Sequence, residues 1–296
     1  MDWDDMRLFL AVARAESLSG AGKALRLDPA TLGRRIAKLE TQIASILFAK
    51  SPQGYALTEA GLRLLPHAEA AEAAMIGAVE SIRGEESEGL SGQIRLGAPD
   101  GCANYLLPAV LAPIIAANPA LEVQIVALPR VFNLSKREAD MAIGVSRPET
   151  GRLTVQKLTD YHLSLAARRD WLESQPPLRS PADLRGRPMV GYIPDLIFDR
   201  ELDYLGQLGV ERVALSSNSV SVQLNLLRQG GGLGVVHEFA LPAAPELVRV
   251  IPDQFRLTRS FWLIRHADDA RVARLNRFAE LLVLGARRVI GKLEVA

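Results

Sequence analysis

The side chains best placed for chemistry lie close to the N-terminus, in a segment rich in cations. Thr31, Arg34, Arg35 and Lys38 recur at helical spacing, and Lys23 lies shortly before them. Arginine can pair with guanine through two hydrogen bonds, and hydroxyl and lysine groups can hold phosphates. This face therefore predicts recognition of double-stranded DNA, although a charged helix face is more often simply solvated.

Three short helices are expected to position this face. Apolar spacing predicts a first helix over 4–14 and a second over 19–25, with Ser17 and Ser19 supplying the turn and the N-cap. A third helix is expected to begin after Asp28, which caps it. Its apolar face is formed by Leu32, Ile36, Leu39 and Ile43. A short helix, a tight turn and a second helix with exposed cations can place a recognition helix in the major groove.

A β-hairpin is expected directly after these helices. The segment 48–58 predicts two short strands around a turn that holds Pro52 and Gly54, as in the wing of a winged helix-turn-helix. Such a wing can touch the DNA backbone beside the groove. The residues expected to contact DNA are Ser19, Lys23, Pro29, Ala30, Thr31, Arg34, Arg35, Lys38, Lys50, Gln53 and Tyr55.

The order and spacing of residues in this region resemble the N-terminal signature of LysR-type transcriptional regulators. The sequence departs from that signature at Gly22, where the family usually has a second alanine, and at Ala44-Ser45, where a Leu-Gly turn is common. The resemblance implies a winged helix-turn-helix DNA-binding domain over residues 1–60. It is carried by Phe9, Val12, Ser17, Ser19, Ala21, Leu25, Pro29, Leu39-Glu40, Leu47-Phe48, Leu57-Thr58 and Ala60-Gly61.

A long linker follows, over residues 58–92. It begins with an alanine-rich stretch that predicts one helix to about Arg83, and Pro66 is expected to bend that helix. The small N-terminal domain cannot cover the helix's apolar stripe, so antiparallel pairing with a second subunit is expected, in a homodimer or a homotetramer. An acidic, Gly/Ser-rich hinge over 84–92 ends the linker. The stripe consists of Leu62, Leu65, Ala68, Met75, Val79 and Ile82.

Strands and helices alternate after the hinge. A strand over 93–98, a helix over 104–117 and a strand over 121–128 form a β-α-β unit, which predicts a parallel sheet. Two α/β subdomains with a cleft between them are the simplest packing of such an alternation. It continues through the segments 139–145, 163–167, 181–184, 189–192, 199–208, 213–215, 220–229 and 234–237.

This C-terminal arrangement resembles the effector domain of LysR-type regulators, itself similar to periplasmic solute-binding proteins. The resemblance is carried by Leu106–Pro108, Asn118-Pro119, Ala139–Gly144 and Gln229–Val236. The expected fold is therefore mixed. It joins a mainly α winged helix-turn-helix and a long linker helix to a two-subdomain α/β effector domain over 93–296, with subdomain I at about 93–166 and 266–296 and subdomain II at about 167–265.

Ligands of open α/β sheets bind beyond the carboxyl ends of the strands, which points to the loops that follow them. Asp100 could instead cap its helix, and Arg147 could form an exposed salt bridge. Cys102 is best explained as a small packed residue, and His237 as a hydrogen-bonded residue at the edge of the core. The residues expected to contact an effector are Asp100, Gly101, Cys102, Leu128, Arg130, Arg147, Phe198, Asn218, Ser219 and His237.

The composition narrows the classes of protein. The chain has 35 basic and 34 acidic residues, so DNA affinity must come from a local patch. One cysteine and 4 scattered histidines predict neither a disulfide nor a zinc site, and no catalytic residues, metal or cofactor are expected. An acidic N-terminus and the lack of a long apolar run predict a cytoplasmic protein without a membrane span.

The sequence thus predicts a DNA-binding transcription regulator, not an enzyme. A small-molecule effector in the C-terminal cleft is expected to modulate its DNA affinity or the bending of DNA. The expected partners are operator DNA, the effector, further copies of the chain and RNA polymerase. The alternative is a cleft-fold enzyme or a solute-binding protein with an accessory helical domain, but the sequence shows neither the assembled active site nor the export segment that these would need.

Overall fold

The computed structural model describes residues 3–51, 54–83, 89–127, 139–210 and 212–295, which fall into two compact units. Unit 1 holds the described residues up to 83 together with 266–276. Unit 2 holds the described residues of 89–265 together with 277–295. Among the described residues, no helix is sufficiently long and apolar to cross a bilayer.

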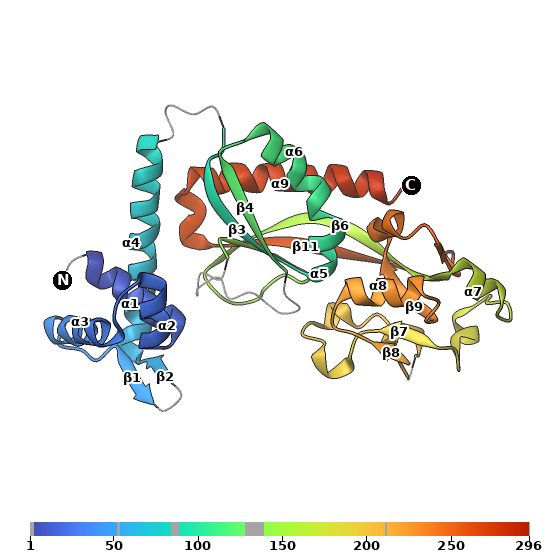
Figure 1. The fold of residues 1–296 in the computed structure, drawn as a ribbon, viewed down its shortest axis with the longest axis horizontal. Helices are drawn as coiled ribbons and strands as arrows, with labels where there is room; N and C mark the ends of the chain where they lie inside the picture. Colours follow the sequence, from blue (N-terminus) through green and yellow to red (C-terminus); the bar gives the residue numbers. More distant parts are fainter. Residues whose placement is uncertain (1–2, 52–53, 84–88, 128–138, 211, 296) are drawn as a thin grey trace. The chain divides into compact units, whose positions relative to one another are not determined.

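Unit 1 begins with three helices and a hairpin (Figure 1). Phe9 and Phe48 have ring centroids 5.4 Å apart, which joins the first helix to the first strand in one apolar core. The predicted inner face of the third helix is confirmed, with Leu32, Ile36 and Leu39 buried and Ile43 packed against them. The elements are α1 (Trp3–Ala15), α2 (Leu18–Leu25), α3 (Pro29–Gln42), β1 (Phe48–Ser51) and β2 (Gly54–Leu57).

Side chains at the helix starts fix this arrangement. Asp28 accepts a hydrogen bond of 2.9 Å from the backbone N–H of Thr31, so the predicted cap of α3 is confirmed. The N-cap of α2 is Ser17, which accepts from the N–H of Gly20 at 3.0 Å. The expected start of this helix at Ser19 was one residue late, because Ser17 already satisfies the first free N–H groups.

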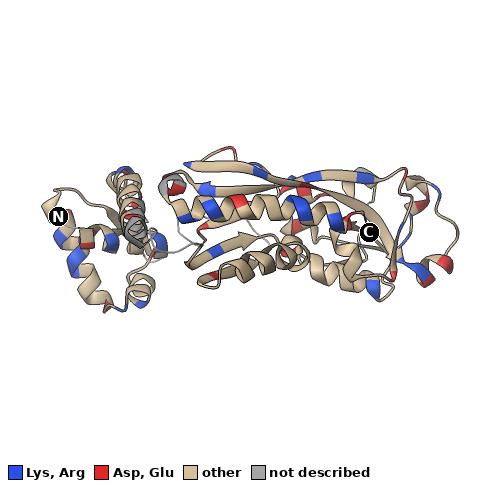
Figure 2. Ribbon diagram, turned by 90° about the horizontal axis from the view of Figure 1, so that it is seen from above, with Lys and Arg blue, Asp and Glu red and all other residues tan. Residues whose placement is uncertain are grey.

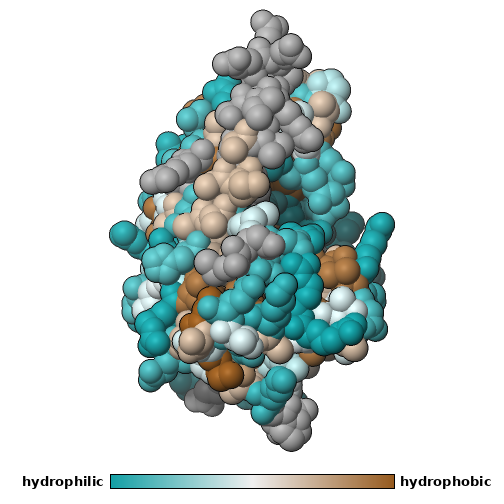
Figure 3. All heavy atoms as spheres, turned by 90° about the vertical axis from the view of Figure 1, so that its left-hand side faces the viewer, coloured by the Kyte–Doolittle hydropathy of each residue, from teal (hydrophilic) through white to brown (hydrophobic). Residues whose placement is uncertain are grey.

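Helix α4 (Glu59–Arg83) matches the predicted linker helix and contains Pro66. Ala68 on its predicted stripe is buried, whereas Leu62 is 57% and Met75 is 48% exposed. Figure 3 shows tan, weakly hydrophobic residues along the part of this helix that is not grey. Part of the apolar stripe is therefore accessible in a single chain. The hinge residues 84–88 lie outside the described residues.

Unit 2 is built on one sheet with the strand order β4-β3-β5-β11-β6-β9-β7-β8, and β10 pairs with β6 (Figure 1). Parallel pairs β3–β4, β3–β5, β7–β8 and β7–β9 confirm the predicted parallel arrangement at both ends of the sheet. The strands are β3 (Gly92–Ala98), β4 (Leu121–Ala127), β5 (Met141–Gly144), β6 (Leu153–Arg168), β7 (Met189–Gly191), β8 (Leu215–Ser216), β9 (Leu233–His237), β10 (Leu247–Arg249) and β11 (Arg256–His266).

The two long strands β6 and β11 differ from the sequence prediction. They pair antiparallel with β9 and β5, respectively, and stand between the two parallel groups. Only the second half of β6 was expected, because its first residues are partly or fully exposed and form no continuous apolar run. These strands join the two lobes of unit 2 into one sheet.

The helices of unit 2 also differ from the sequence prediction. The predicted helix over 104–117 is two helices separated at Leu106. Pro108 lacks an N–H and cannot continue the hydrogen-bond ladder of the first helix, so a new helix begins at Leu107. The helices are α5 (Asp100–Tyr105), α6 (Leu107–Ala117), α7 (Arg169–Glu173), α8 (Val220–Arg228) and α9 (Ala273–Leu293).

The segment 199–208 does not form the expected regular helix. Its N-terminal part is a 3-10 turn at Arg200–Leu202, and a second turn lies at Gly206–Leu208. The carboxylate of Asp203 accepts from the N–H of Gly206 at 3.1 Å, and this local bond competes with a helical ladder. Other 3-10 turns lie at Pro181–Leu184, as predicted, and at Pro194–Leu196, Glu238–Ala243 and Ala267–Arg271.

Candidate nucleic-acid interface and effector pocket

The outer face of α3 carries the cations that the sequence singled out. Arg34 and Lys38 are exposed, and Arg34 Nη2 donates to Thr31 Oγ1 at 3.2 Å. Within the described part of the chain, neither cation has an ion-pair partner. Pro29 and Ala30 are exposed at the start of the same helix. Two cations and a hydroxyl are therefore accessible along one side of α3.

Arg35 has a different environment from Arg34. Its guanidinium forms an ion pair with Asp4 and another with Asp5, whose Oδ1 lies 2.9 Å from Nη2. Both carboxylates belong to the first turn of α1. Arg35 therefore holds α3 against α1, and the two carboxylates largely balance its charge.

The turn between α2 and α3 explains one departure from the family pattern. A Cβ on Gly22 would lie 2.6 Å from the carbonyl oxygen of Leu27, and the N–H of Leu27 donates to the carbonyl of Gly22 at 2.9 Å. Arg26 closes α2 in the left-handed conformation, with φ of 55°. The glycine thus permits a close turn directly before α3.

The β1–β2 hairpin forms the expected wing, and part of that wing is described. Lys50 is exposed, with Nζ 5.8 Å from the centre of the half-buried Tyr55 ring. Tyr55 N–H donates to the carbonyl of Glu16 at 2.8 Å and holds the second strand against the α1–α2 turn. Ser19 and Lys23 are exposed on α2, whereas Gln53 lies outside the described residues.

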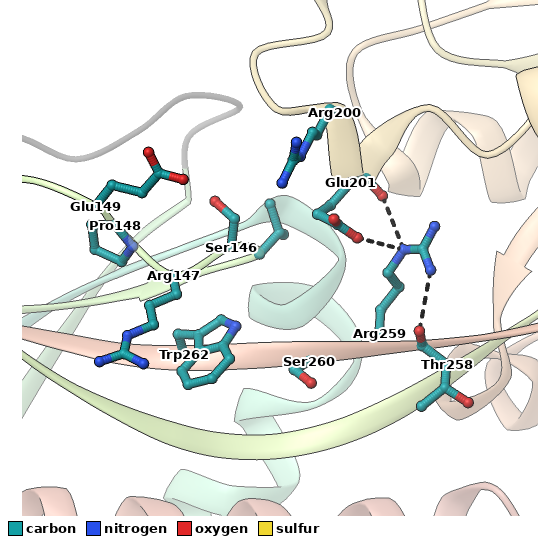
Figure 4. A pocket seen from close by; sticks show the side chains of 11 residues that line it. Ser146, Arg147, Pro148, Glu149, Arg200, Glu201, Thr258, Arg259, Ser260 and Trp262 are labelled. Atoms are coloured by element: carbon teal, nitrogen blue, oxygen red, sulfur yellow. Dashed lines mark hydrogen bonds and ion pairs between the residues drawn. The ribbon is translucent and has the colours of Figure 1, made fainter.

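Unit 2 contains a cavity of about 680 Å³, within the usual size range of small-molecule sites (Figure 4). It is formed by three segments: the chain after β5, the turn at Arg200–Leu202, and β11. The strand register brings two of them together, because Trp262 lies opposite Gly144. The lining residues are Val145, Ser146, Arg147, Pro148, Glu149, Arg200, Glu201, Thr258, Arg259, Ser260 and Trp262.

Hydrogen bonds hold these segments in place. Asp199 accepts from Ser146 Oγ and, at 2.9 Å, from the N–H of Glu201, so it ties the chain after β5 to the 3-10 turn. Arg259 Nε lies 2.9 Å from Glu201 Oε2, which ties the same turn to β11. The backbone of the turn that carries Arg200 is therefore held on both sides, whereas the Arg200 side chain is exposed.

Another group of expected effector residues meets at the end of β3. The Asp100 carboxylate accepts from Ser219 Oγ at 3.0 Å and from the N–H of Ser221 at 2.9 Å. A Cβ on Gly101 would lie 3.3 Å from His237, so these residues pack tightly. Asp100 caps α8 rather than its own helix, whose N-cap is Pro99. The hydrogen-bond partners of the Asp100 carboxylate are therefore other residues of the protein.

Two side chains beside this group are buried and uncharged. Burial lowers the pKa of His237 to about 4, against the opposing influence of Asp100. Burial raises the pKa of the Cys102 thiol well above its ordinary value. The ring of His237 stacks on Tyr161 with centroids 5.3 Å apart. Both side chains pack in the interior, and a thiol held in its protonated form is a poor nucleophile.

Of the remaining residues that the sequence predicts to contact an effector, one lines the cavity. Arg147 lines the cavity, whereas Phe198 and Asn218 are half-buried and are not among its lining residues. Leu128 and Arg130 lie outside the described residues. The sequence reasoning missed Arg200, Arg259 and Trp262. The alternation of charged and apolar residues in 256–266 could have indicated a strand there, but nothing local pairs that strand with β5.

Two His/carboxylate groups also come close together. Near the end of α9, His162 lies beside Glu294 and Glu238, but Glu238 already pairs with Arg256 at 2.7 Å. In unit 1, His266 lies 3.5 Å from Glu69 and 3.4 Å from Asp268. These contacts are explained as ion pairs or hydrogen bonds, without a metal.

A winged helix-turn-helix with exposed cations, joined to a two-lobed α/β domain, defines the class of ligand-responsive DNA-binding regulators. The family comparison agrees with this architecture. Residues 3–62 match the model of bacterial regulatory helix-turn-helix proteins of the lysR family, and residues 87–286 match the LysR substrate binding domain. The chain belongs to the LysR family of transcription regulators. It is a DNA-binding regulator with an effector-binding domain, and not an enzyme.

Individual relatives cover most of the chain. The transcriptional regulator PtxR of Pseudomonas aeruginosa is 26% identical over 82% of this chain and 80% of its own length. The activator TtdR of Escherichia coli is 24% identical over 97% and 94%. Full-length OxyR of Pseudomonas aeruginosa has a TM-score of 0.73 at 17% identity, over 97% and 94% of the two chains. ArgP of Mycobacterium tuberculosis has a TM-score of 0.68 at 19% identity, over 97% of each chain.

Proposed function

We propose that α3 reads operator DNA through Thr31, Arg34 and Lys38. These side chains are accessible on one face, and the two cations lack ion-pair partners in the described parts of the chain. Arg35 supports DNA binding indirectly, because its ion pairs with Asp4 and Asp5 hold α3 against α1. Supporting contacts come from the exposed side chains of Ser19, Lys23, Pro29 and Ala30 and from the wing residues Lys50, Gln53 and Tyr55.

Pairing of α4 with the same helix of a second subunit is the second part of the proposal. Met75 is a large apolar side chain about half exposed on this helix, and a partner helix would cover it. A two-fold dimer presents two recognition helices to a partly palindromic site. Two such dimers would give a tetramer. The corresponding domains are 1–60 for DNA binding, 58–92 for the linker and 93–296 for the effector.

The cavity lined by Arg147, Arg200 and Arg259 is the proposed effector site. An effector that favours one arrangement of the subunits by one or two kcal/mol would change DNA occupancy severalfold. We also propose that the protein acts in the cytoplasm and that RNA polymerase is a further partner. These last two assignments follow from the activity of a regulator on DNA.

The α3 assignment is tested with a duplex selected from randomised DNA by the full-length protein. Arg34→Ala should weaken binding by about 1–3 kcal/mol, roughly tenfold or more. Lys38→Ala should lower the slope of log affinity against log salt by about one. Arg63→Ala is the control, because Arg63 is 74% exposed and belongs to α4 rather than to α3. Parental affinity in both α3 variants would refute the assignment.

A further inference from the structure

The charges around the effector cavity restrict the ligand it can hold. Three arginines and two glutamates line it, which leaves one positive charge in excess. Glu201 is paired with Arg259 at 2.9 Å. Within the described residues, Arg147 and Arg200 have no such partner, and Figure 4 shows Arg200 pointing from its turn into the cavity. A ligand that neutralises this site carries a single negative charge.

The remaining walls are apolar. Trp262 is half-buried, so part of its indole is accessible from the cavity, and Val145 and Pro148 add apolar surface beside it. An indole face favours a flat ring in an offset stack. Arginine binds carboxylates through two parallel hydrogen bonds in one plane. The cavity therefore offers a planar anion site close to a planar apolar surface.

The other anion-compatible position in unit 2 is already filled. The N-terminus of α8 would attract an anion, but the Asp100 carboxylate already lies there and accepts from Ser219 Oγ and from the N–H of Ser221. A second carboxylate at that place would meet like charge. This closure leaves the arginine-lined cavity as the better position for an anionic ligand.

We propose that the effector is a small monocarboxylate with a flat apolar group. Its carboxylate binds Arg200, and its ring packs on Trp262. This inference rests on the proposed effector role of the cavity. The anchoring of the turn through Asp199 and Glu201 supports it, because it keeps the backbone of Arg200 beside the cavity.

Benzoate is the probe, and its binding to the full-length protein is measured by calorimetry and by the shift in melting temperature. Benzamide keeps the ring without the charge, acetate keeps the charge without the ring, and succinate is a dianion. Benzoate is expected to bind at least about tenfold more tightly than each of these, because a charge-assisted pair and a stacked ring act together. Equal binding of benzamide, or preference for succinate, would overturn the proposed ligand class.

Substitutions of lining residues test whether benzoate binds in this cavity. Arg200→Gln should weaken benzoate binding about tenfold. Trp262→Leu should weaken benzoate binding but leave acetate binding unchanged. Arg185→Gln is the control, since Arg185 is exposed in another part of unit 2. Unchanged benzoate affinity in Arg200→Gln, with a parental melting temperature, would overturn the site.

The DNA measurements separate this inference from the proposed function. No saturable binding at millimolar benzoate, with Arg34-dependent DNA binding intact, overturns only the ligand class and its site. Loss of the expected dependence on Arg34 contradicts the DNA-reading proposal and leaves the ligand result to be judged separately.

Discussion

Asp100 Oδ2 lies 2.9 Å from the backbone nitrogen of Ser221 and so joins the first turn of α5 to the start of α8. The two residues are 121 positions apart in the chain. The same oxygen accepts from Ser219 Oγ, the side chain of the N-cap residue of α8. This carboxylate therefore links the two lobes of unit 2 and caps a helix that is distant in sequence.

Replacing Asp100 should destabilise unit 2. Asp100→Ala removes the acceptor of three hydrogen bonds, from Ser219, Ser221 and Asn104, and should lower the free energy of unfolding by about 1–2 kcal/mol. Asp100→Asn keeps one acceptor oxygen, so its free energy of unfolding should fall less than that of Asp100→Ala. Urea unfolding followed by circular dichroism measures both variants, with exposed Asp195→Ala as the control. A loss in Asp100→Ala no larger than in the control would show that the link contributes nothing.

Ala44 offers a stabilising substitution. It follows the C-terminus of α3 with φ of 50°, in the left-handed region that glycine adopts without steric cost. Ala44→Gly should therefore raise the free energy of unfolding of unit 1 by about 0.5–1 kcal/mol. Thermal unfolding of the full chain, compared with the parent, measures the change. A lower melting temperature would contradict this account of the turn.

Gly22 should not tolerate a side chain. The Cβ of Gly22→Ala would lie 2.6 Å from the backbone oxygen of Leu27, and a backbone atom cannot move aside cheaply. We expect a loss of about 1–3 kcal/mol in stability, with weaker DNA binding as the turn before α3 shifts. Gly291→Ala is the matched control, because a Cβ there meets nothing within 4 Å. Equal unfolding free energies for the two variants would argue against a close turn.

His237 should make stability depend on pH. Its pKa falls from 6.5 to about 4 on folding, so the unfolded chain binds the proton more readily. Stability from this group is fully present above pH 6.5 and is lost as the pH falls towards 4. Between pH 7 and 5 the loss should be about 2 kcal/mol.

The non-titrating variant His237→Phe isolates this contribution. Between pH 7 and 5 its free energy of unfolding should fall by about 2 kcal/mol less than that of the parent, because no proton is taken up at this position. Urea unfolding at each pH gives the comparison. Identical pH profiles for the two proteins would show that His237 does not titrate with the shifted pKa.

The sequence by itself determined the local elements of the DNA-binding region. The Asp28 cap, the apolar face of α3 and the pairing of the two wing strands all depend on residues only a few positions apart. Helical periodicity and capping are properties of such short segments, so they are visible without a fold. The family signature in the same segment gave the class of protein, which the family comparison confirms.

Figure 2 shows basic and acidic residues interspersed over unit 2, where charge pattern alone would not single out a ligand site. The tertiary structure decided which of them meet. Arg147, Arg200 and Arg259 come from three separate segments, joined by the register of β5 with β11 and by the bonds of Asp199. It also showed that Arg35 faces two acids of α1, unlike its neighbour Arg34. Sheet pairing and ion pairs between distant residues depend on the packed chain as a whole, and no local pattern encodes them.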